Sequence, residues 1–136
     1  MNILFAGTPS NSAKILDHLA KLKTFNIKGV LTQPDKPNRR GRNLRESPVA
    51  VVAKNLKLDV FKPRILNSNK IMKILSSLDI DFLIVVAYGK IIPAWLLKLP
   101  NILPINVHFS LLPKYRGASP IQSALLHGDI SSGISI

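Results

Sequence analysis

Residues 1–32 read MNILFAGTPSNSAKILDHLAKLKTFNIKGVLT, and the class of fold follows from this pattern. An apolar run over residues 2–6 predicts a strand, and a turn, GTPS, follows at residues 7–10. Apolar residues at helical spacing over 13–22 predict a helix, and a second strand is expected over 27–32. A strand, a helix and a strand in this order form a β-α-β unit, whose two strands are parallel.

The rest of the chain continues to alternate between strands and helices. Helices are expected over residues 48–56, 68–78, 91–99 and 118–126, and strands over 58–61, 81–87, 102–108 and 132–136. The run DFLIVVA at 81–87 is apolar almost throughout, which is typical of a strand covered on both faces of a sheet. We therefore predict an α/β fold: a doubly wound, mostly parallel sheet with helices on both faces, in one domain over residues 1–136.

The chain is strongly basic, with 19 Lys and Arg against 7 Asp and Glu and a formal net charge of +12. Such an excess attracts polyanions, nucleic acid above all. Lysines are spread over several expected helices, whereas the aperiodic segment 33–47 gathers four arginines: Arg39, Arg40, Arg42 and Arg45. Because a guanidinium group binds phosphate through two parallel hydrogen bonds, a polyanion-binding loop is favoured over a merely solvated one.

Several function classes are disfavoured by what the sequence lacks. It has no cysteine, and no second His or carboxylate stands at metal-ligand spacing from His108, so we expect no disulfide and no metal. No apolar run is long enough to span a membrane, and the N-terminus shows no secretory signal, so we expect a cytoplasmic protein without membrane association. The turn at 7–10 lacks Gly-x-Gly-x-x-Gly, which counts against a nucleotide-binding protein, the weakest alternative.

Asn106 and His108 lie two residues apart in the strand expected over 102–108, so their side chains point to the same face. They stand near the end of that strand, where open α/β sheets bind ligands. An amide N–H stabilises an oxyanion on an attacked carbonyl, and an imidazole exchanges a proton with the reacting group. The pair suits acyl-type transfer, although spacing alone leaves a structural or capping role open. The following SLLP at 110–113 offers an apolar wall for a flat ligand.

The segment NVHFSLLPKYRGASPI at 106–121 resembles the signature of the folate-dependent formyltransferases. Three further stretches resemble, within that family, the enzymes that formylate methionyl-tRNA. They are FAGTP at 5–9, TQPD at 32–35 with the basic segment after it, and VVAYG at 85–89. The likeness covers nearly the whole chain in order.

This resemblance implies 10-formyltetrahydrofolate as the formyl donor and the amino group of methionine on initiator tRNA as the acceptor. It implies that Asn106 polarises the formyl oxygen and that His108 assists proton transfer. The folate site implied by the resemblance includes Ser110, Leu111, Leu112 and Pro113, with the backbone near Val86, Ala87, Tyr88 and Gly89. The implied tRNA-binding residues are Arg39, Arg40, Arg42 and Arg45, with Arg40 matched to the key arginine of the family. We expect a monomeric, cytoplasmic transferase of translation initiation.

The family pattern also sets limits on this expectation. Phe109 and Ser119 depart from it but leave the flanking motif intact. The catalytic aspartate of the family lies beyond the strand expected at 132–136, and Asp129, before that strand, is not expected to replace it. We therefore expect residues 1–136 to be an incomplete N-terminal catalytic domain, without the C-terminal tRNA-binding domain of the family and with little activity alone.

Two alternatives stay open. Formyltransferases that act on a glycinamide nucleotide or an amino sugar share the central motif but do not need the arginine-rich segment. A non-catalytic folate- or RNA-binding remnant is the alternative of another class.

Overall fold

The computed structural model describes residues 1–37 and 44–136. Five strands form one sheet: β1 (Asn2–Gly7), β2 (Asn26–Leu31), β5 (Val60–Phe61), β6 (Phe82–Val86) and β7 (Leu103–Val107). Their order is β5-β2-β1-β6-β7, and all neighbours pair in parallel. The helices are α1 (Ser10–Lys21), α2 (Pro48–Asn55), α3 (Asn69–Ser76), α4 (Ala94–Leu97) and α5 (Pro120–Leu126). A separate antiparallel pair joins β3 (Lys36–Pro37) to β4 (Leu44–Arg45).

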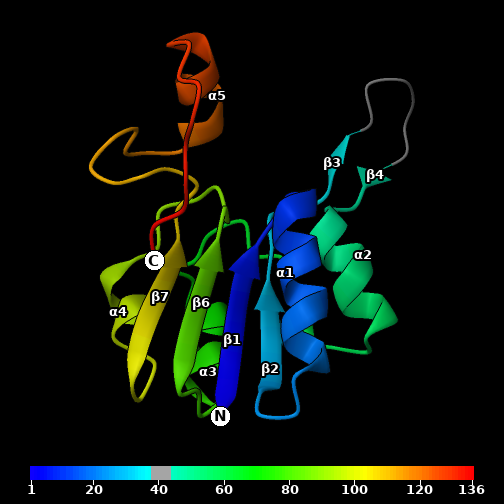
Figure 1. Ribbon diagram of the computed structural model, residues 1–136. Helices are drawn as coiled ribbons and strands as arrows, with labels where there is room; N and C mark the ends of the chain where they lie inside the picture. The colour runs from blue at the N-terminus through cyan, green and yellow to red at the C-terminus, as the bar shows by residue number, and fades with distance from the viewer. Residues whose placement is uncertain (38–43) are drawn as a thin grey trace.

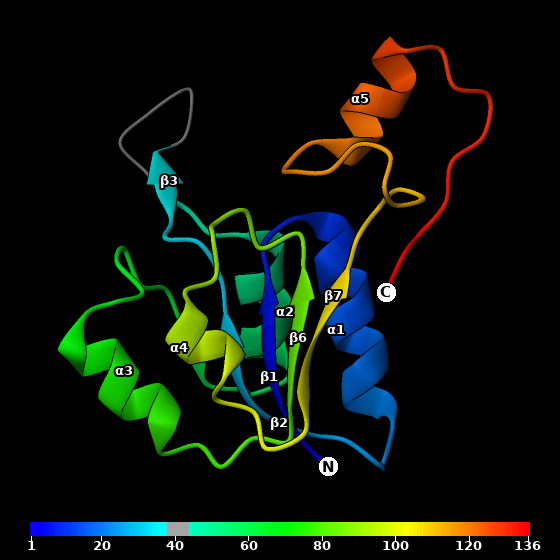
Figure 2. The same cartoon turned by 90° about the vertical axis from the view of Figure 1, so that its left-hand side faces the viewer.

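The two faces of the sheet are covered by different helices, as Figures 1 and 2 show for α1 and α2 against α3 and α4. β1 explains why, because its side chains alternate between two apolar clusters. Phe5 packs in the cluster that contains Leu16 of α1, and Leu4 packs in the one that contains Leu75 of α3. The predicted doubly wound parallel sheet is therefore confirmed.

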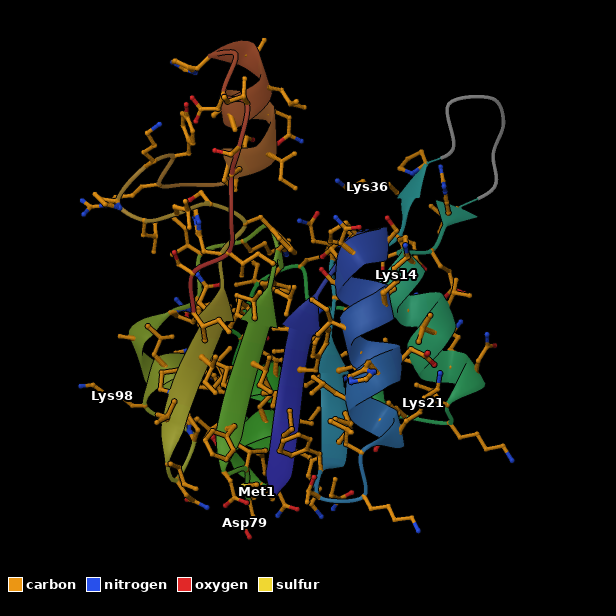
Figure 3. All side chains as sticks on the ribbon, viewed as in Figure 1. Met1, Lys14, Lys21, Lys36, Asp79 and Lys98 are labelled. Atoms are coloured by element: carbon orange, nitrogen blue, oxygen red, sulfur yellow. The ribbon has the colours of Figure 1, made fainter. Side chains whose placement is uncertain are left out.

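The strand order places a topological switch point between β1 and β6. From β1 the chain builds outward through β2 and β5, and it then returns to the other side of β1 for β6 and β7. In open α/β sheets, ligands bind at the carboxyl ends of the strands beside such a point. The loops after β1, β2, β6 and β7 all leave the sheet at this edge, and the β3–β4 pair stands there too (Figure 1). In Figure 3, Lys36 is seen at this edge, and Met1 and Asp79 at the opposite one.

The strand predicted over residues 132–136 is wrong. Only an isolated antiparallel bridge forms there, between Ser135 and His108, with both backbone hydrogen bonds at 2.9 Å. Ile134 and Ile136, the apolar residues of this alternating segment, are both exposed, so they cover no apolar surface of the sheet. The helix predicted over 91–99 shortens to α4, since Pro93 stands in extended conformation at its N-cap. None of the helices in the described ranges is both long and apolar enough to cross a membrane.

Candidate functional site

Asn106 and His108 are carried to the edge of the sheet by β7. Asn106 pairs in register with Val85 of β6, and His108 follows directly after the strand. The Asn106 side chain is exposed, and no group in the described part of the chain forms a hydrogen bond with its amide. His108 is half-buried, and its backbone is held by the bridge to Ser135. A free amide donor and an oriented imidazole thus stand together at the open end of a central parallel sheet.

The His108 ring is held by a hydrogen bond with the Ser110 side chain. The ring Nδ1 lies 2.9 Å from Ser110 Oγ, and that hydroxyl donates to the Lys114 carbonyl at 2.7 Å. Ser110 has no exposed surface. Its hydroxyl is therefore used in hydrogen bonds inside the protein, so Ser110 could contact a ligand only through its backbone.

The Leu111–Pro113 segment offers the apolar surface that the sequence suggests. Leu111 and Leu112 are 56% and 48% exposed, and Pro113 is exposed beside them. Ser135 holds this loop, since its hydroxyl accepts from Leu112 N at 3.0 Å and donates to Ser110 O at 2.9 Å. Three exposed apolar side chains on a hydrogen-bonded loop can cover one face of a flat ring.

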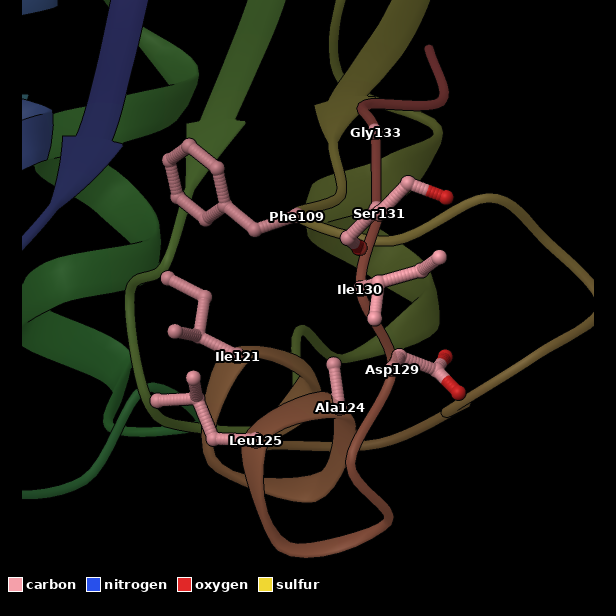
Figure 4. A pocket seen from close by; sticks show the side chains of 9 residues that line it. Phe109, Ile121, Ala124, Leu125, Asp129, Ile130, Ser131 and Gly133 are labelled. Carbon is pink, nitrogen blue, oxygen red and sulfur yellow. The ribbon is translucent and has the colours of Figure 1, made fainter.

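An open apolar hollow of about 250 Å³ lies between Phe109 and α5. Figure 4 shows Ile121 and Leu125 of α5 on the same side as Phe109, with Ile130 and Ser131 opposite. Phe109, which departs from the family pattern, therefore contributes apolar lining to this hollow.

The loop after β6 is anchored through its carbonyl groups. Ser12 Oγ donates to Val86 O at 2.6 Å, while Thr8 Oγ1 and Gln33 Nε2 donate to Tyr88 O at 2.8 and 3.0 Å. These contacts tie the loop to the segments after β1 and β2, across the switch point. The sequence suggests Ser12 only as a possible helix cap and gives no role to the side chains of Thr8 and Gln33, although these two lie in the FAGTP and TQPD stretches. Ser12 instead lies inside α1, which has Pro9 at its N-cap.

This anchoring holds the loop in an unusual backbone conformation. Ala87 has φ 45° and Gly89 has φ 79°, and a non-glycine residue in the left-handed region costs conformational energy. A Cβ atom at Gly89 would lie 2.2 Å from Gln33 Nε2, so a larger residue would push the Gln33 side chain away from its bond to Tyr88 O. The side chains of Val86 and Tyr88 are buried. Ligand contacts along Val86–Gly89 would therefore come mainly from the backbone.

Tyr88 places a polar group in the core without a partner. Its side chain is 1% exposed, and among the described residues no group bonds to its hydroxyl. Burial disfavours the phenolate and raises the pKa of Tyr88 to about 12.

Tyr88→Phe is expected to raise the free energy of unfolding by about 1–2 kcal/mol at neutral pH, because it removes a buried hydroxyl that lacks a hydrogen bond. The raised pKa adds a second difference. Because the phenol stays neutral in the folded protein, its contribution to the free energy of unfolding is complete below pH 10.0 and is lost as the pH rises through about 12. The Phe variant has no group that titrates there, so its free energy of unfolding should not fall for this reason. Urea unfolding at pH 7 and above pH 10 measures both.

Tyr115→Phe is the matched control, because the Tyr115 hydroxyl donates to Asp129 Oδ2 at 3.0 Å. We expect this control to lower stability. A loss of stability in Tyr88→Phe of the same sign would contradict the unpartnered state of the Tyr88 hydroxyl.

The β3–β4 pair is held at its base by a cluster of ion pairs. Lys62 Nζ lies 2.7 Å from Asp35 Oδ1 and 2.6 Å from Glu46 Oε1, and Lys54 also pairs with Glu46. Hydrogen bonds from Lys54 and Lys62 lower the pKa of Glu46 to about 2. The lysines thereby neutralise the two acidic residues that flank β3 and β4.

Of the four predicted tRNA-binding arginines, the structure places Arg45. It lies exposed on β4, opposite Lys36 of β3. Arg39, Arg40 and Arg42 lie outside the described residues. A smaller hollow of about 170 Å³ is lined by Lys36, Arg45 and Gln33, and Gln33 is also bonded to Tyr88 O. Gln33 therefore lies between the β3–β4 pair and the loop after β6.

Asp129 has other partners than His108. It accepts from Tyr115 at 3.0 Å and pairs with Lys114 at 3.3 Å, and these contacts lower its pKa. Within residues 1–37 and 44–136, no carboxylate bonds to His108, and no three His, Asp or Glu side chains form a group that could hold a metal ion.

Comparisons with known proteins all point to one family. A family model described as formyl transferase matches residues 1–136. The methionyl-tRNA formyltransferase of Thermotoga maritima is 46% identical over the whole chain, which spans 43% of that relative. The enzyme of the same name from Mycoplasmopsis pulmonis is also 46% identical over the whole chain, which spans 46% of it. The chain thus spans less than half the length of these curated relatives.

Solved structures show the same fold at lower identity. A glycinamide ribonucleotide transformylase from Geobacillus kaustophilus superposes with a TM-score of 0.73 at 21% identity, covering 98% of this chain and 71% of that one. A phosphoribosylglycinamide formyltransferase from Anaplasma phagocytophilum gives 0.68 at 22% identity, covering 94% and 59%.

Proposed function

We propose that this chain, which belongs to the formyl transferase family, forms the catalytic part of a methionyl-tRNA formyltransferase. The observation that carries the proposal is 46% identity over all 136 residues to enzymes of that name. The proposed reaction transfers a formyl group from 10-formyltetrahydrofolate to the amino group of methionine on initiator tRNA, at the start of cytoplasmic protein synthesis. We further propose that residues 1–136 act as an N-terminal domain, within a monomer that also carries a C-terminal tRNA-binding domain.

Asn106 and His108 have the chemistry that this reaction needs. The folate supplies the formyl carbon, which is attacked by the neutral amine of methionine. Asn106 donates a hydrogen bond to the formyl oxygen as negative charge develops there. His108 accepts the proton that the amine loses when the new C–N bond forms, and a proton is returned to the folate nitrogen when its bond to the formyl carbon breaks. No covalent bond to the protein is needed.

The described loops suit a flat, polar ring such as the pteridine of folate. The exposed side chains of Leu111, Leu112 and Pro113 can cover its face. The strained backbone of Val86–Gly89, held at its carbonyls, can supply hydrogen bonds to its edge. Both loops stand at the carboxyl edge of the sheet, on neighbouring strands β6 and β7.

The acceptor is tested by neutralising the arginine-rich segment. In a polypeptide of the relatives' full length that contains this chain, the triple variant Arg39→Gln, Arg40→Gln, Arg42→Gln is expected to raise the KM for methionyl-tRNA by about tenfold or more. It should also reduce the salt slope of binding by up to about 2–3, because each lost phosphate contact contributes roughly 0.7–0.9. Initial rates against tRNA concentration at several salt concentrations measure both effects.

The matched control removes the same charge from three segments that lead into the amino ends of β2, β5 and β7, with Lys23→Gln, Lys57→Gln and Lys98→Gln. It should change the KM little. If the arginine variant formylated methionyl-tRNA as the unchanged protein does, Arg39, Arg40 and Arg42 would not bind the tRNA. If the unchanged protein formylated a glycinamide nucleotide or an amino sugar but not methionyl-tRNA, the tRNA assignment would be wrong.

A further inference from the structure

We propose that Ser110 is a positioning residue that keeps the neutral His108 imidazole in the tautomer with its proton on Nδ1. Nε2 is then the unprotonated nitrogen. The catalytic consequence rests on the proposed function, whereas the tautomer itself follows from the hydrogen bonds of the chain.

The direction of the hydrogen bonds follows from what each atom can donate. A carbonyl oxygen only accepts, and a serine hydroxyl carries one proton. Ser110 Oγ lies 2.7 Å from Lys114 O, so the hydroxyl proton must lie between these two oxygens. Were it turned toward His108, two oxygen lone pairs would face each other at that distance. Ser110 Oγ therefore accepts from His108, and Nδ1, 2.9 Å away, must carry a proton.

The surroundings prevent this arrangement from reversing. Ser110 is 0% exposed, so no bulk water competes for its hydroxyl. Lys114 is held in a turn by the bond from its N–H to Leu111 O at 3.0 Å. Ser135 holds both His108 and Ser110, through its backbone bonds to His108 and the hydrogen bond from its hydroxyl to Ser110 O. Ring, hydroxyl and carbonyl are therefore oriented before any ligand binds.

This orientation decides which nitrogen can act as a base. In a neutral imidazole only one nitrogen has a free lone pair. With Nδ1 donating into the interior, that lone pair is on Nε2, to which no group of residues 1–37 or 44–136 bonds. Without the Ser110 hydroxyl, no described group selects between the tautomers, and in the other tautomer the only basic nitrogen would face the buried position 110. Ser110 thus keeps the basic nitrogen of His108 available to a substrate.

The tautomer is measured directly by proton–nitrogen correlation spectra of the 136-residue chain with ¹⁵N-labelled histidine, at a pH where the imidazoles are neutral. We expect a protonated Nδ1 and an unprotonated Nε2 for His108. In Ser110→Ala, the His108 signals should move toward those of the other tautomer. A wild-type His108 that carries its proton on Nε2, or a folded Ser110→Ala variant with unchanged His108 signals, would overturn the proposal.

The chain provides its own controls. The His127 Nδ1 lies 2.8 Å from the Ser123 carbonyl, so His127 should keep its proton on Nδ1 in both proteins. Ser77→Ala removes another hydroxyl that donates to a backbone carbonyl, that of Ile74 at 2.8 Å, and should leave His108 unchanged. The wild-type spectrum alone decides the tautomer if Ser110→Ala does not fold.

In the polypeptide of full length, Ser110→Ala should lower kcat by roughly 10- to 100-fold with little change in the KM for methionyl-tRNA. A merely structural role would not change the tautomer. The two proposals fail separately: the expected spectrum without any formyl transfer would refute the function and leave the role of Ser110 intact. Formyl transfer by a protein whose neutral His108 carries its proton on Nε2 would support the function and refute the role of Ser110.

Discussion

His108→Gln is expected to lower kcat for formyl transfer by about 10²- to 10⁴-fold, with a much smaller change in the KM for methionyl-tRNA. Glutamine keeps a polar side chain at the end of β7 but cannot take up a proton near neutral pH. The loss should therefore fall on the chemical step rather than on binding. Single-turnover rates with saturating folate and tRNA, in the polypeptide of full length, measure that step.

The control for this variant is His18→Gln. His18 lies exposed on α1, away from the carboxyl edge of the sheet, so the same change there should leave kcat as it is. An unchanged kcat in His108→Gln would remove the imidazole from the mechanism. A folate- or RNA-binding remnant predicts another result, in which binding is found but no turnover depends on His108.

Asn106→Ala is expected to lower kcat by about 10²- to 10³-fold, the usual cost of removing one donor to an oxyanion. Asn106 is exposed and its amide has no partner among the described residues, so its removal opens no cavity. The melting temperature should therefore stay within about 1–2 °C of the original, which follows from a surface change of a few tenths of a kcal/mol. Rate and melting temperature measured on one preparation separate chemistry from folding.

A second substitution sharpens this test. Asn106→Asp keeps the shape of the side chain but replaces the N–H donor by a negative charge, so it should lower kcat more than alanine does. Asn101→Ala is the control at the other end of β7, where the amide donates to Asp79 Oδ1 at 3.0 Å. Equal activity of the two Asn106 variants and the unchanged protein would mean that the amide does not stabilise the oxyanion.

The sheet could be predicted because its signals are local. The apolar runs that became β1 and β6 reach into clusters on both faces of the sheet, and such runs are readable in any window of a few residues. In segment 132–136 a local pattern is not enough to form a strand. Its alternation resembles a strand, but pairing needs a neighbouring strand and an apolar surface, and the structure provides only one bridge, at Ser135.

The loop after β6 shows a different limit. The predicted strand ran to residue 87, but β6 ends at Val86 because Ala87 turns into the left-handed region. Such a turn at an alanine has no sequence signal, since glycine or asparagine is the usual residue there. It is held by the bonds to Tyr88 O from Thr8, 80 residues earlier, and from Gln33, 55 residues earlier.

The sequence by itself determined the parallel α/β class and predicted that Asn106 and His108 share one face near the end of one strand, because β-α-β order and the two-residue period of a strand are properties of neighbouring residues. In the structure Asn106 lies on β7, and His108 follows directly after it. Tertiary structure alone decided that β6 lies between β1 and β7, that the loop after β6 is tied to Thr8 and Gln33, and that the hydroxyl of Ser110 is buried between His108 and Lys114. These contacts depend on strand order and burial, which exist only once the sheet has assembled, and the expected tautomer of His108 depends on them.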